Sequence, residues 1–362
     1  MTDGGVRVSV FGKTDLGRAR DHNEDAFLVA DLTTGVASLL PGVREHELGP
    51  RGSLFVVADG MGGAAAGEVA SDMAIQHIFQ HMTTAWTNDP DGSPQRFALR
   101  MREAVEQANA EIYEHARTHS EMRGMGTTVT VAGAMGPNLY LAQIGDSRAY
   151  LVRSGTAIQL TRDQSLTQRL VDAGELTEEE AEQSERRNII LQALGPDAQV
   201  KVDVSHQPIR RGDTLLICSD GLSGAVRRDE FGALVSGEPD LLALCGALID
   251  LANERGGPDN ITVVAARFEG AALPEPQADD AVGYEAYATG PTNGLAADPE
   301  DETNELITRD TPDAMAAEFD TIEGRAPGPR AVAAPAGEGR RRADAVEPSD
   351  SPPAGAPPRD PA

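Results

Sequence analysis

The chain has 362 residues, of which 40% are hydrophobic, and a formal net charge of −27. This length allows a large core, whereas the negative field repels phosphate backbones and argues against nucleic-acid binding. No secretory hydrophobic region and no apolar stretch of about 18 residues is present, and Cys218 and Cys245 lie inside apolar runs, so we expect a cytoplasmic protein with buried thiols and no membrane contact.

The first part of the chain alternates between strand and helix patterns. Apolar runs predict strands at 6–10, 26–30 and 53–58. The Gly- and Pro-containing stretch 33–52 predicts a surface loop or a hairpin. Apolar residues spaced three and four positions apart predict helices that begin near Gly67 and near Pro94. Both helices are expected to pack on a sheet.

From Gly126 the apolar period changes to two. Three strands joined by Gly-containing turns are predicted, and they suggest an antiparallel meander: 127–132, 139–144 and 148–152. A polar segment at 161–193 is expected to lie over the surface. It is followed by a buried strand, a helix and a last strand: 214–219, 241–252 and 261–268. This order predicts an α+β layered domain at residues 6–269.

The composition changes after Phe268. From Gly270 onward the sequence is rich in Ala, Pro, Gly and acids, contains no Lys and offers no apolar run long enough to bury much surface. Residues 270–362 are therefore predicted to form a disordered, acidic, Pro/Ala-rich tail.

Acids recur at the ends of four predicted strands. Asp59-Gly60 and Asp220-Gly221 follow apolar runs, while Asp25 and Asp259 precede them. Since strands end at the edge of a sheet, these carboxylates can converge although they are far apart in sequence. Hard oxygen ligands without accompanying Cys and His favour Mg²⁺ or Mn²⁺ over zinc, so the pattern predicts a metal centre.

The glycine-rich run 59–63 has competing interpretations. A dinucleotide fingerprint would need Gly where the chain has Ala65, and a P-loop would need Gly-Lys-Ser/Thr, which is absent. A simple glycine turn stays open for this motif alone. The repeated acids favour two ions that activate water for attack on phosphorus, and a guanidinium at Arg20 could bind two phosphate oxygens.

Six motifs then occur in a familiar order. They are Arg20-Asp21-His22-Asn23-Glu24-Asp25, Val57-Ala58-Asp59-Gly60-Met61-Gly62-Gly63, Gly124-Met125-Gly126-Thr127-Thr128, Gly145-Asp146-Ser147-Arg148, Ser219-Asp220-Gly221 and Gly257-Pro258-Asp259-Asn260. Over residues 6 to 268 the chain resembles the metal-dependent type 2C protein phosphatases, in particular the bacterial branch that opposes Ser/Thr protein kinases. The resemblance implies two packed antiparallel β-sheets flanked by α-helices, a four-layer αββα sandwich, with a flap at about 161–193.

The resemblance also implies a ligand set for two Mn²⁺ or Mg²⁺ ions. Asp59 would bridge both ions, the Gly60 carbonyl would ligate one, and Asp220 and Asp259 would ligate the other. Asp25 would contribute mainly through metal-bound water, as an outer ligand.

The implied reaction is hydrolysis of phosphoserine and phosphothreonine on proteins by a metal-bridging hydroxide. Glu24 would act through metal-bound water like Asp25, and Arg20 would bind the phosphate group. The implied partners are phosphorylated proteins, including Ser/Thr kinases, and we expect a monomer.

Two positions depart from the family pattern. Eukaryotic members commonly carry a His after Asp-Gly, which is a candidate general acid, whereas this chain has Met61. Many bacterial members place an Asp before Gly-Met-Gly-Thr-Thr, where it helps to hold a third metal, whereas this chain has Arg123. Two ions are therefore expected, and a third site is doubtful.

Other interpretations stay open from the sequence. A partner-switching phosphatase that acts on anti-sigma-factor antagonists would carry the same motifs. A non-catalytic binding module would keep the fold, although all four metal carboxylates are present here. Asp146 and Arg148 are predicted to form a structural turn with an ion pair, and the segment 161–193 is either a mobile flap or an ordinary surface hairpin of helices.

Overall fold

The computed structural model describes residues 4–62 and 66–289. Most of the predicted tail, residues 290–362, lies outside the described residues. Within the described ranges, no helix combines the length and the apolar character that a bilayer span requires.

The elements follow one another with strands at both ends of the domain. The strands are β1 (Arg7–Asp15), β2 (Asp25–Asp31), β3 (Val36–Ala37), β4 (Glu45–Glu47), β5 (Ser53–Met61), β6 (Gly126–Thr127), β7 (Val129–Met135), β8 (Asn138–Ile144), β9 (Arg148–Arg153), β10 (Thr156–Gln159), β11 (Asp203–Pro208), β12 (Thr214–Cys218) and β13 (Ile261–Glu269). The helices are α1 (Pro41–Arg44), α2 (Ala66–His81), α3 (Pro94–Thr118), α4 (Leu166–Asp172), α5 (Glu178–Gln183), α6 (Asp220–Ser223), α7 (Arg228–Gly237) and α8 (Leu241–Glu254), with short turns η1 (Met82–Trp86) and η2 (Ser120–Met122).

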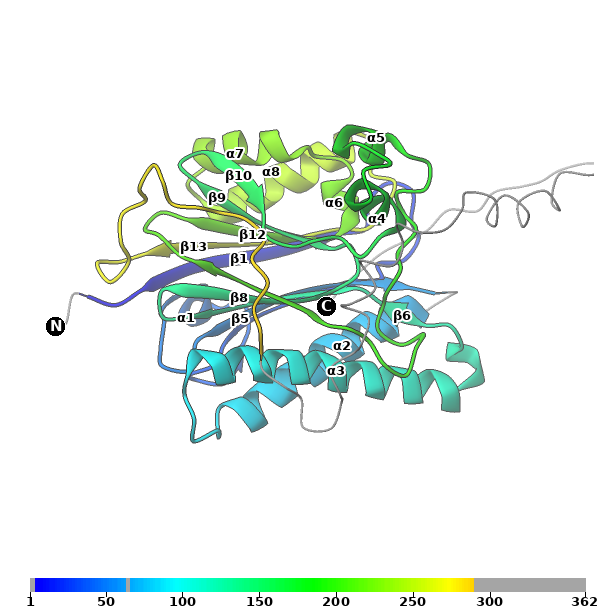
Figure 1. Ribbon diagram of the computed structural model, residues 1–362, viewed down its shortest axis with the longest axis horizontal. Helices are drawn as coiled ribbons and strands as arrows, with labels where there is room; N and C mark the ends of the chain where they lie inside the picture. The colour runs from blue at the N-terminus through cyan, green and yellow to red at the C-terminus, as the bar shows by residue number, and fades with distance from the viewer. Residues whose placement is uncertain (1–3, 63–65, 290–362) are drawn as a thin grey trace, which may run out of the picture. The chain divides into compact units, whose positions relative to one another are not determined.

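In the described residues, the strands form two antiparallel sheets that pack face to face. One sheet has the order β10-β9-β12-β13-β1-β4, and the other has the order β11-β8-β7-β5-β2-β3, with β6 paired to β5. Helices α2 and α3 cover the outer face of the second sheet, while α7 and α8 cover that of the first (Figure 1). The predicted αββα sandwich is therefore confirmed.

The central strands are continuously apolar because both of their faces are covered. In β5, the residues from Leu54 to Ala58 are fully buried. Phe55 and Val57 face the core between the two sheets, whereas Leu54, Val56 and Ala58 face the helical layer. An apolar run of this kind places a strand inside a layered fold, with its polar end at the edge.

Helix α3 shows how the local sequence sets the helical layer. The Ser93 side chain accepts a hydrogen bond from the Arg96 amide, and Pro94 occupies the first turn, which are favourable N-terminal features. The predicted apolar stripe is buried against the sheet: Phe97, Met101, Ala104, Val105, Ala108 and Ile112. The stretch 33–52 forms a short β2–β3 hairpin, α1 and β4, which pairs with β1.

The predicted meander is correct only for β7 and β8, which pair antiparallel. Strand β9 pairs with β12 and β10 in the other sheet, so the turn after β8 crosses between the sheets. Gly145 makes this turn with φ of 99°, where a Cβ would lie 2.7 Å from the Thr128 side chain. A period of two is the same in either sheet, which is why the pattern could not assign β9.

The described chain continues beyond the predicted domain end at residue 269. Leu273 is buried and packs with the core between the sheets. Residues 270–289, which we call the strap, then run along the outer edge of β11, where Ala286 bridges Ser205. The segment 161–193, which we call the flap, contains α4 and α5.

Candidate metal centre

The predicted acids lie at one end of the sandwich because of the strand registers. Asp25 opens β2 directly opposite Asp59 of β5. In the other sheet, β12 ends beside the start of β13, with Cys218 opposite Val263. Asp220 follows the first of these strands and Asp259 precedes the second, so both flank the same edge.

Asp25 connects the two sheets at this edge. The Ser219 hydroxyl donates a 2.7 Å hydrogen bond to Asp25 Oδ2, while Asp25 Oδ1 is buried without a hydrogen-bond partner. Burial raises the pKa of Asp25 to about 7, against the lowering effect of hydrogen bonds to Thr262 and Ser219. The neighbouring carboxylates of Asp220 and Asp259 raise this pKa further.

Asp59 and Asp220 share this environment. Burial raises the pKa of Asp59 well above its ordinary value, and repulsion from Asp25 and Asp220 adds to the effect. Burial, followed by the charge of Asp259, raises the pKa of Asp220. Its Oδ1 atom is also buried without a partner. Buried like charges with unpartnered oxygens are a site that a cation would stabilise.

Two threonines of the Gly-Met-Gly-Thr-Thr motif hold the backbone of Asp59. The Asp59 carbonyl accepts hydrogen bonds from the Thr127 hydroxyl and the Thr128 amide, both at 2.9 Å. The Asp59 amide donates to the Thr128 hydroxyl at 3.3 Å, and this hydroxyl contacts Ser147 Oγ at 2.8 Å. The motif therefore positions the central acid from the neighbouring strand.

Glu24 packs against backbone at two glycines. The Gly60 amide donates to the Glu24 carbonyl at 3.0 Å, and a Cβ on Gly60 would lie 2.2 Å from the Gly67 carbonyl oxygen. A Cβ on Gly67 would lie 2.6 Å from Glu24 Oε1. Both positions thus require glycine. Burial is the main cause of a raised pKa at Glu24.

Asn260 fixes the loop that carries Arg20 and Glu24. Its side-chain amide donates to the carbonyls of Leu16 at 3.0 Å and His22 at 2.9 Å, and its Oδ1 accepts from the Glu24 amide at 2.9 Å. Three hydrogen bonds from one buried side chain set the loop's position relative to β13.

Arg20 reaches the same edge from this loop. Its Nη2 donates to Asp259 Oδ2 at 2.7 Å, and 48% of the Arg20 side chain remains exposed. The guanidinium therefore has further donors available to solvent beside the acids, as a phosphate-binding group requires.

The chemistry of the donor atoms decides whether these acids can hold a metal ion. Among residues 4–62 and 66–289, no cluster of three or more His, Cys, Asp or Glu side chains is arranged as an ion site. The donors are nevertheless hard oxygens, and two of them, on Asp25 and Asp220, are buried without partners. Burial, together with mutual repulsion, holds the pKa values of Asp25 and Asp59 high. The residues fit Mn²⁺ or Mg²⁺, and the individual ligands stay a prediction.

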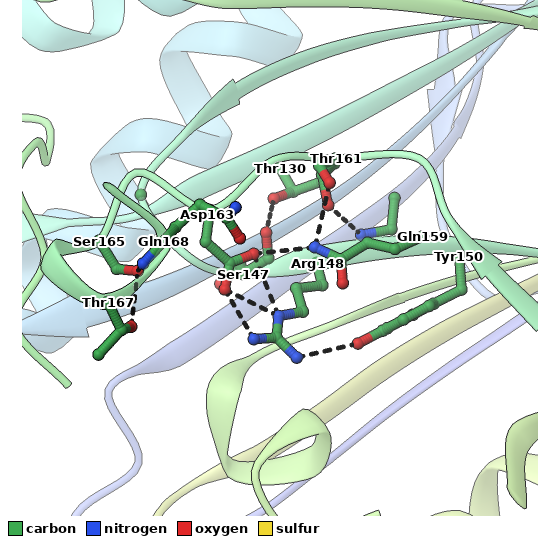
Figure 2. Close-up of polar contacts among 12 residues, drawn as sticks. Thr130, Ser147, Arg148, Tyr150, Gln159, Thr161, Asp163, Ser165, Thr167 and Gln168 are labelled. Atoms are coloured by element: carbon green, nitrogen blue, oxygen red, sulfur yellow. Dashed lines mark hydrogen bonds and ion pairs between the residues drawn. The ribbon is translucent and has the colours of Figure 1, made fainter. Parts of the chain in front are cut away.

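The predicted ion pair between Asp146 and Arg148 is wrong. Figure 2 shows the Arg148 guanidinium directed to Asp163, with Nη2 and Oδ2 2.7 Å apart, and to the Tyr150 hydroxyl. Asp146 instead belongs with the acids, because burial and then repulsion from Asp220 raise its pKa to about 7. The sequence offers acids on both sides of Arg148, and only the tertiary structure selects between them.

Several positioning residues were not assigned a role from the sequence. These are Thr127, Thr128, Ser219 and the side chain of Asn260. Each lies inside or beside a motif with a predicted ligand, and that proximity was the available signal. Their hydrogen-bond partners come from other strands, so the contacts could not be inferred from spacing. Of the departures from the family pattern, Arg123 is exposed beside η2.

Hard oxygen donors beside an exposed guanidinium, at the edge of an αββα sandwich, define a divalent-metal-dependent phosphoester hydrolase. The family model for protein phosphatase 2C matches residues 45–256. The chain belongs to this family.

Similar proteins agree with this assignment. The chain is 36% identical over 253 residues to serine/threonine phosphatase stp of Listeria monocytogenes. This alignment covers 70% of this chain and 92% of that protein. It is 37% identical over 254 residues to serine/threonine protein phosphatase PstP of Mycobacterium tuberculosis. Here the alignment covers 70% of this chain and 44% of that protein. A crystal structure of the PstP catalytic domain with two manganese ions aligns with a TM-score of 0.59 and 33% identity, over 73% of this chain and 99% of that one.

These findings confirm the predicted family and the enzyme class of metal-dependent protein phosphatase, and the PstP catalytic domain is a relative that binds two manganese ions.

Proposed function

We infer that this protein removes phosphate from phosphoserine and phosphothreonine in proteins. The observation that carries this function is the group of acids Asp25, Asp59 and Asp220 at one sheet edge, where Asp25 and Asp220 each keep a buried oxygen without a partner and Arg20 extends an exposed guanidinium. Relatives named serine/threonine phosphatases support the same reaction.

We assign the metal ligands as predicted from the family motifs. Asp59, the Gly60 carbonyl, Asp220 and Asp259 would hold the two ions, with Asp59 shared between them. Asp25 would act from outside through water. When bound, the two ions supply Lewis acidity, which activates water at neutral pH and neutralises charge on phosphoryl oxygens.

The other residues bind and orient. Arg20 offers its fork of N–H donors to two phosphate oxygens, and releases Asp259 as it does so. Asn260 holds the Arg20 loop and Glu24 in place. Ser219 fixes one oxygen of Asp25, and the other oxygen stays buried without a hydrogen-bond partner.

The cellular role is a finer part of the proposal. The substrates include Ser/Thr protein kinases and their phosphorylated targets, and the protein works as a monomer in the cytoplasm in signalling. The net charge of −27 disfavours contact with nucleic acid or anionic membranes. The relatives give no support to the alternatives of a partner-switching phosphatase or a non-catalytic module.

The test is hydrolysis of p-nitrophenyl phosphate and of phosphocasein by the full chain with Mn²⁺. We expect turnover that EDTA abolishes and that Asp220→Asn lowers at least about a hundredfold, since charge stabilisation by a metal contributes several kcal/mol. Unchanged activity in Asp220→Asn would refute the proposed centre. The exposed variant Asp229→Asn is the matched control.

A further inference from the structure

The strap, residues 270–289, lies outside the region matched by the family model, which ends at residue 256. Figure 1 shows this stretch in yellow to orange, running across the two sheets to the layer of α2 and α3. Leu273 is 1% exposed, and it packs with Val282 into the core between the sheets. Burial of one such side chain contributes about 1.5–3 kcal/mol, so the strap is held on the domain by more than polar contacts.

The strap covers the outer edge of β11. This strand pairs with β8 on one side and ends the sheet on the other. On that free side, the His206 amide donates to the Glu285 carbonyl at 3.0 Å, and the Tyr287 amide donates to the Val204 carbonyl at 2.7 Å. The strap thus supplies partners to an edge strand that would otherwise expose its backbone groups.

Side chains add to this backbone pairing. The Arg210 guanidinium donates to both carboxylate oxygens of Asp280, at 2.8 and 2.6 Å. This bidentate geometry is both strong and directional. Further along the strap, the Tyr284 hydroxyl donates to Asp203 Oδ1 at 2.8 Å. Asp203 is the first residue of β11, so this hydrogen bond fixes the start of the strand that follows the flap in the chain.

Both ends of the flap are attached to this part of the chain. Before the flap, the Leu160 carbonyl accepts a hydrogen bond from the Ser205 hydroxyl of β11 at 3.3 Å. After it, the Lys201 amide donates to Gln192 Oε1 at 2.9 Å. Ser205 is also the residue that Ala286 of the strap bridges. The strap therefore contacts Ser205, the residue of β11 that holds the start of the flap.

A hydrogen bond and charge interactions relate the same three segments. Arg162, at the start of the flap, has a raised pKa because of its hydrogen bond to Asp172, and Tyr284 and Asp203 contribute to it. The pKa of Asp203 is raised by burial, against the effect of its hydrogen bond to Tyr284 and of the positive charge of Arg162. These three side chains lie within electrostatic range of one another, one from the flap, one from β11 and one from the strap.

The flap in turn is bonded to the turn that carries Asp146. Arg148 binds Asp163 of the flap, and Asp163 also accepts from Gln159 (Figure 2). The backbone of Gln164 donates to the Gly145 carbonyl at 2.9 Å, and its side chain accepts from the Gly145 amide at 2.9 Å. Displacement of the flap ends would therefore move the protein surface that borders the acids.

We propose that the strap positions the flap for binding of phosphoproteins, and that Tyr284 is a positioning residue for this specificity through its hydrogen bond to Asp203. This inference rests on the proposed function, because it concerns which substrates the acid edge can receive. A small phosphate ester reaches the acids without touching the flap, whereas a protein substrate must also contact the surface around them. The strap thus sets the affinity for large substrates and leaves the chemistry of small ones unchanged.

The test compares two substrates in the full-length, Mn²⁺-loaded protein. In Tyr284→Phe, which removes one exposed hydroxyl, we expect KM for phosphocasein to rise about threefold to tenfold, the range for the net contribution of one ordinary hydrogen bond. Both kcat and KM for p-nitrophenyl phosphate should stay unchanged. Tyr113→Phe on α3 is the matched control and should alter neither substrate.

Hydrogen exchange gives a readout that needs no turnover. The Leu166 amide bonds to Ile189 and the Leu191 amide bonds to Gln164 within the flap, and we expect both to exchange faster in Tyr284→Phe and in Asp280→Asn. Unchanged KM for phosphocasein together with unchanged exchange would overturn the inference, as would equal losses on both substrates. If the unaltered protein hydrolyses neither substrate, the proposed function fails, and exchange alone decides whether the strap positions the flap.

Discussion

Two groups of buried charge in this protein differ in how they are compensated. At the acid edge, Asp25 and Asp220 each keep a buried oxygen without a partner, and their pKa values are raised. Elsewhere, Arg153 and Asp213, with side chains 7% and 1% exposed, form a bidentate pair at 2.9 and 2.6 Å. Asp213 Oδ2 also accepts from the Arg210 amide at 2.7 Å.

The difference separates a structural role from a functional one. A buried pair with good geometry is compensated within the fold, so its removal should cost stability and spare the chemistry. Uncompensated acids destabilise the metal-free fold, and they persist in proteins where a ligand supplies the missing charge. Substitutions at the acid edge should therefore lower activity and spare stability, whereas substitutions in the Arg153–Asp213 pair should lower stability and spare activity.

The largest effect is expected for Asp59→Asn. Loss of the bridging carboxylate should lower kcat/KM for p-nitrophenyl phosphate about a thousandfold, because several kcal/mol of charge stabilisation are removed. The metal-free protein should be at least as stable as before, since one repelling charge is gone. Kinetics with Mn²⁺ and thermal unfolding in EDTA measure the two quantities. Activity within tenfold of the unaltered protein would contradict the assignment of Asp59.

The opposite signature is expected for Asp213→Asn. It leaves the Arg153 guanidinium buried without its charge partner, which should lower the free energy of unfolding by about 3–5 kcal/mol. Urea titration measures this, and the folded fraction should retain its kcat. The double variant Arg153→Met with Asp213→Leu is the control and should recover much of the loss. A cost below about 1 kcal/mol for the single variant would show that the pair is not structural.

The two groups should also respond differently to pH. The pKa of Asp25 in the folded protein is about 7, above the value of about 3.9 for an unfolded chain. Between these values the folded state binds more protons, so the metal-free protein should lose stability as the pH rises from about 4 to about 7. Thermal unfolding in EDTA should show a falling Tm over this range, and saturating Mn²⁺ should remove the fall. A Tm that rises over the same range without metal would contradict the assigned repulsion.

The smallest effect is expected for Arg20→Lys, which keeps the positive charge and removes the paired N–H donors of the guanidinium. KM for p-nitrophenyl phosphate should rise about tenfold with little change in kcat, because a bidentate contact becomes a single point charge. Arg18→Lys in the same loop is the control. A large fall in kcat with constant KM would mean that Arg20 acts in the transition state and not in substrate binding.

Much of the fold could be predicted because its signals are local. Strands β2, β5, β12 and β13 each contain a run of apolar residues, and α3 has a cap and an apolar stripe. Strand β11 was missed because its sequence, Asp203-Val204-Ser205-His206-Gln207-Pro208, has few apolar residues. It is a strand because β8 and the strap pair with it on either side, and neither partner is visible in the local pattern.

The candidate site divides in the same way. The acids were predicted because each lies next to an apolar run in a motif. The partner of Arg148 was not, because Asp163 lies fifteen residues further along the chain and is brought back by the β9–β10 hairpin. The strap was assigned to the tail because an Ala/Pro-rich composition does not show that Leu273 fills a gap between two sheets.

By itself, the amino-acid sequence determined which residues carry charge at the ends of strands, and therefore the family, the reaction class and the candidate ligands. Only the tertiary structure decided which of those charges are compensated. Arg153 and Asp213 meet across neighbouring strands, whereas Asp25, Asp59 and Asp220 meet one another. The physical reason is that spacing along the chain sets a residue's place in its own strand, while the energy of a buried charge depends on groups that other strands bring beside it.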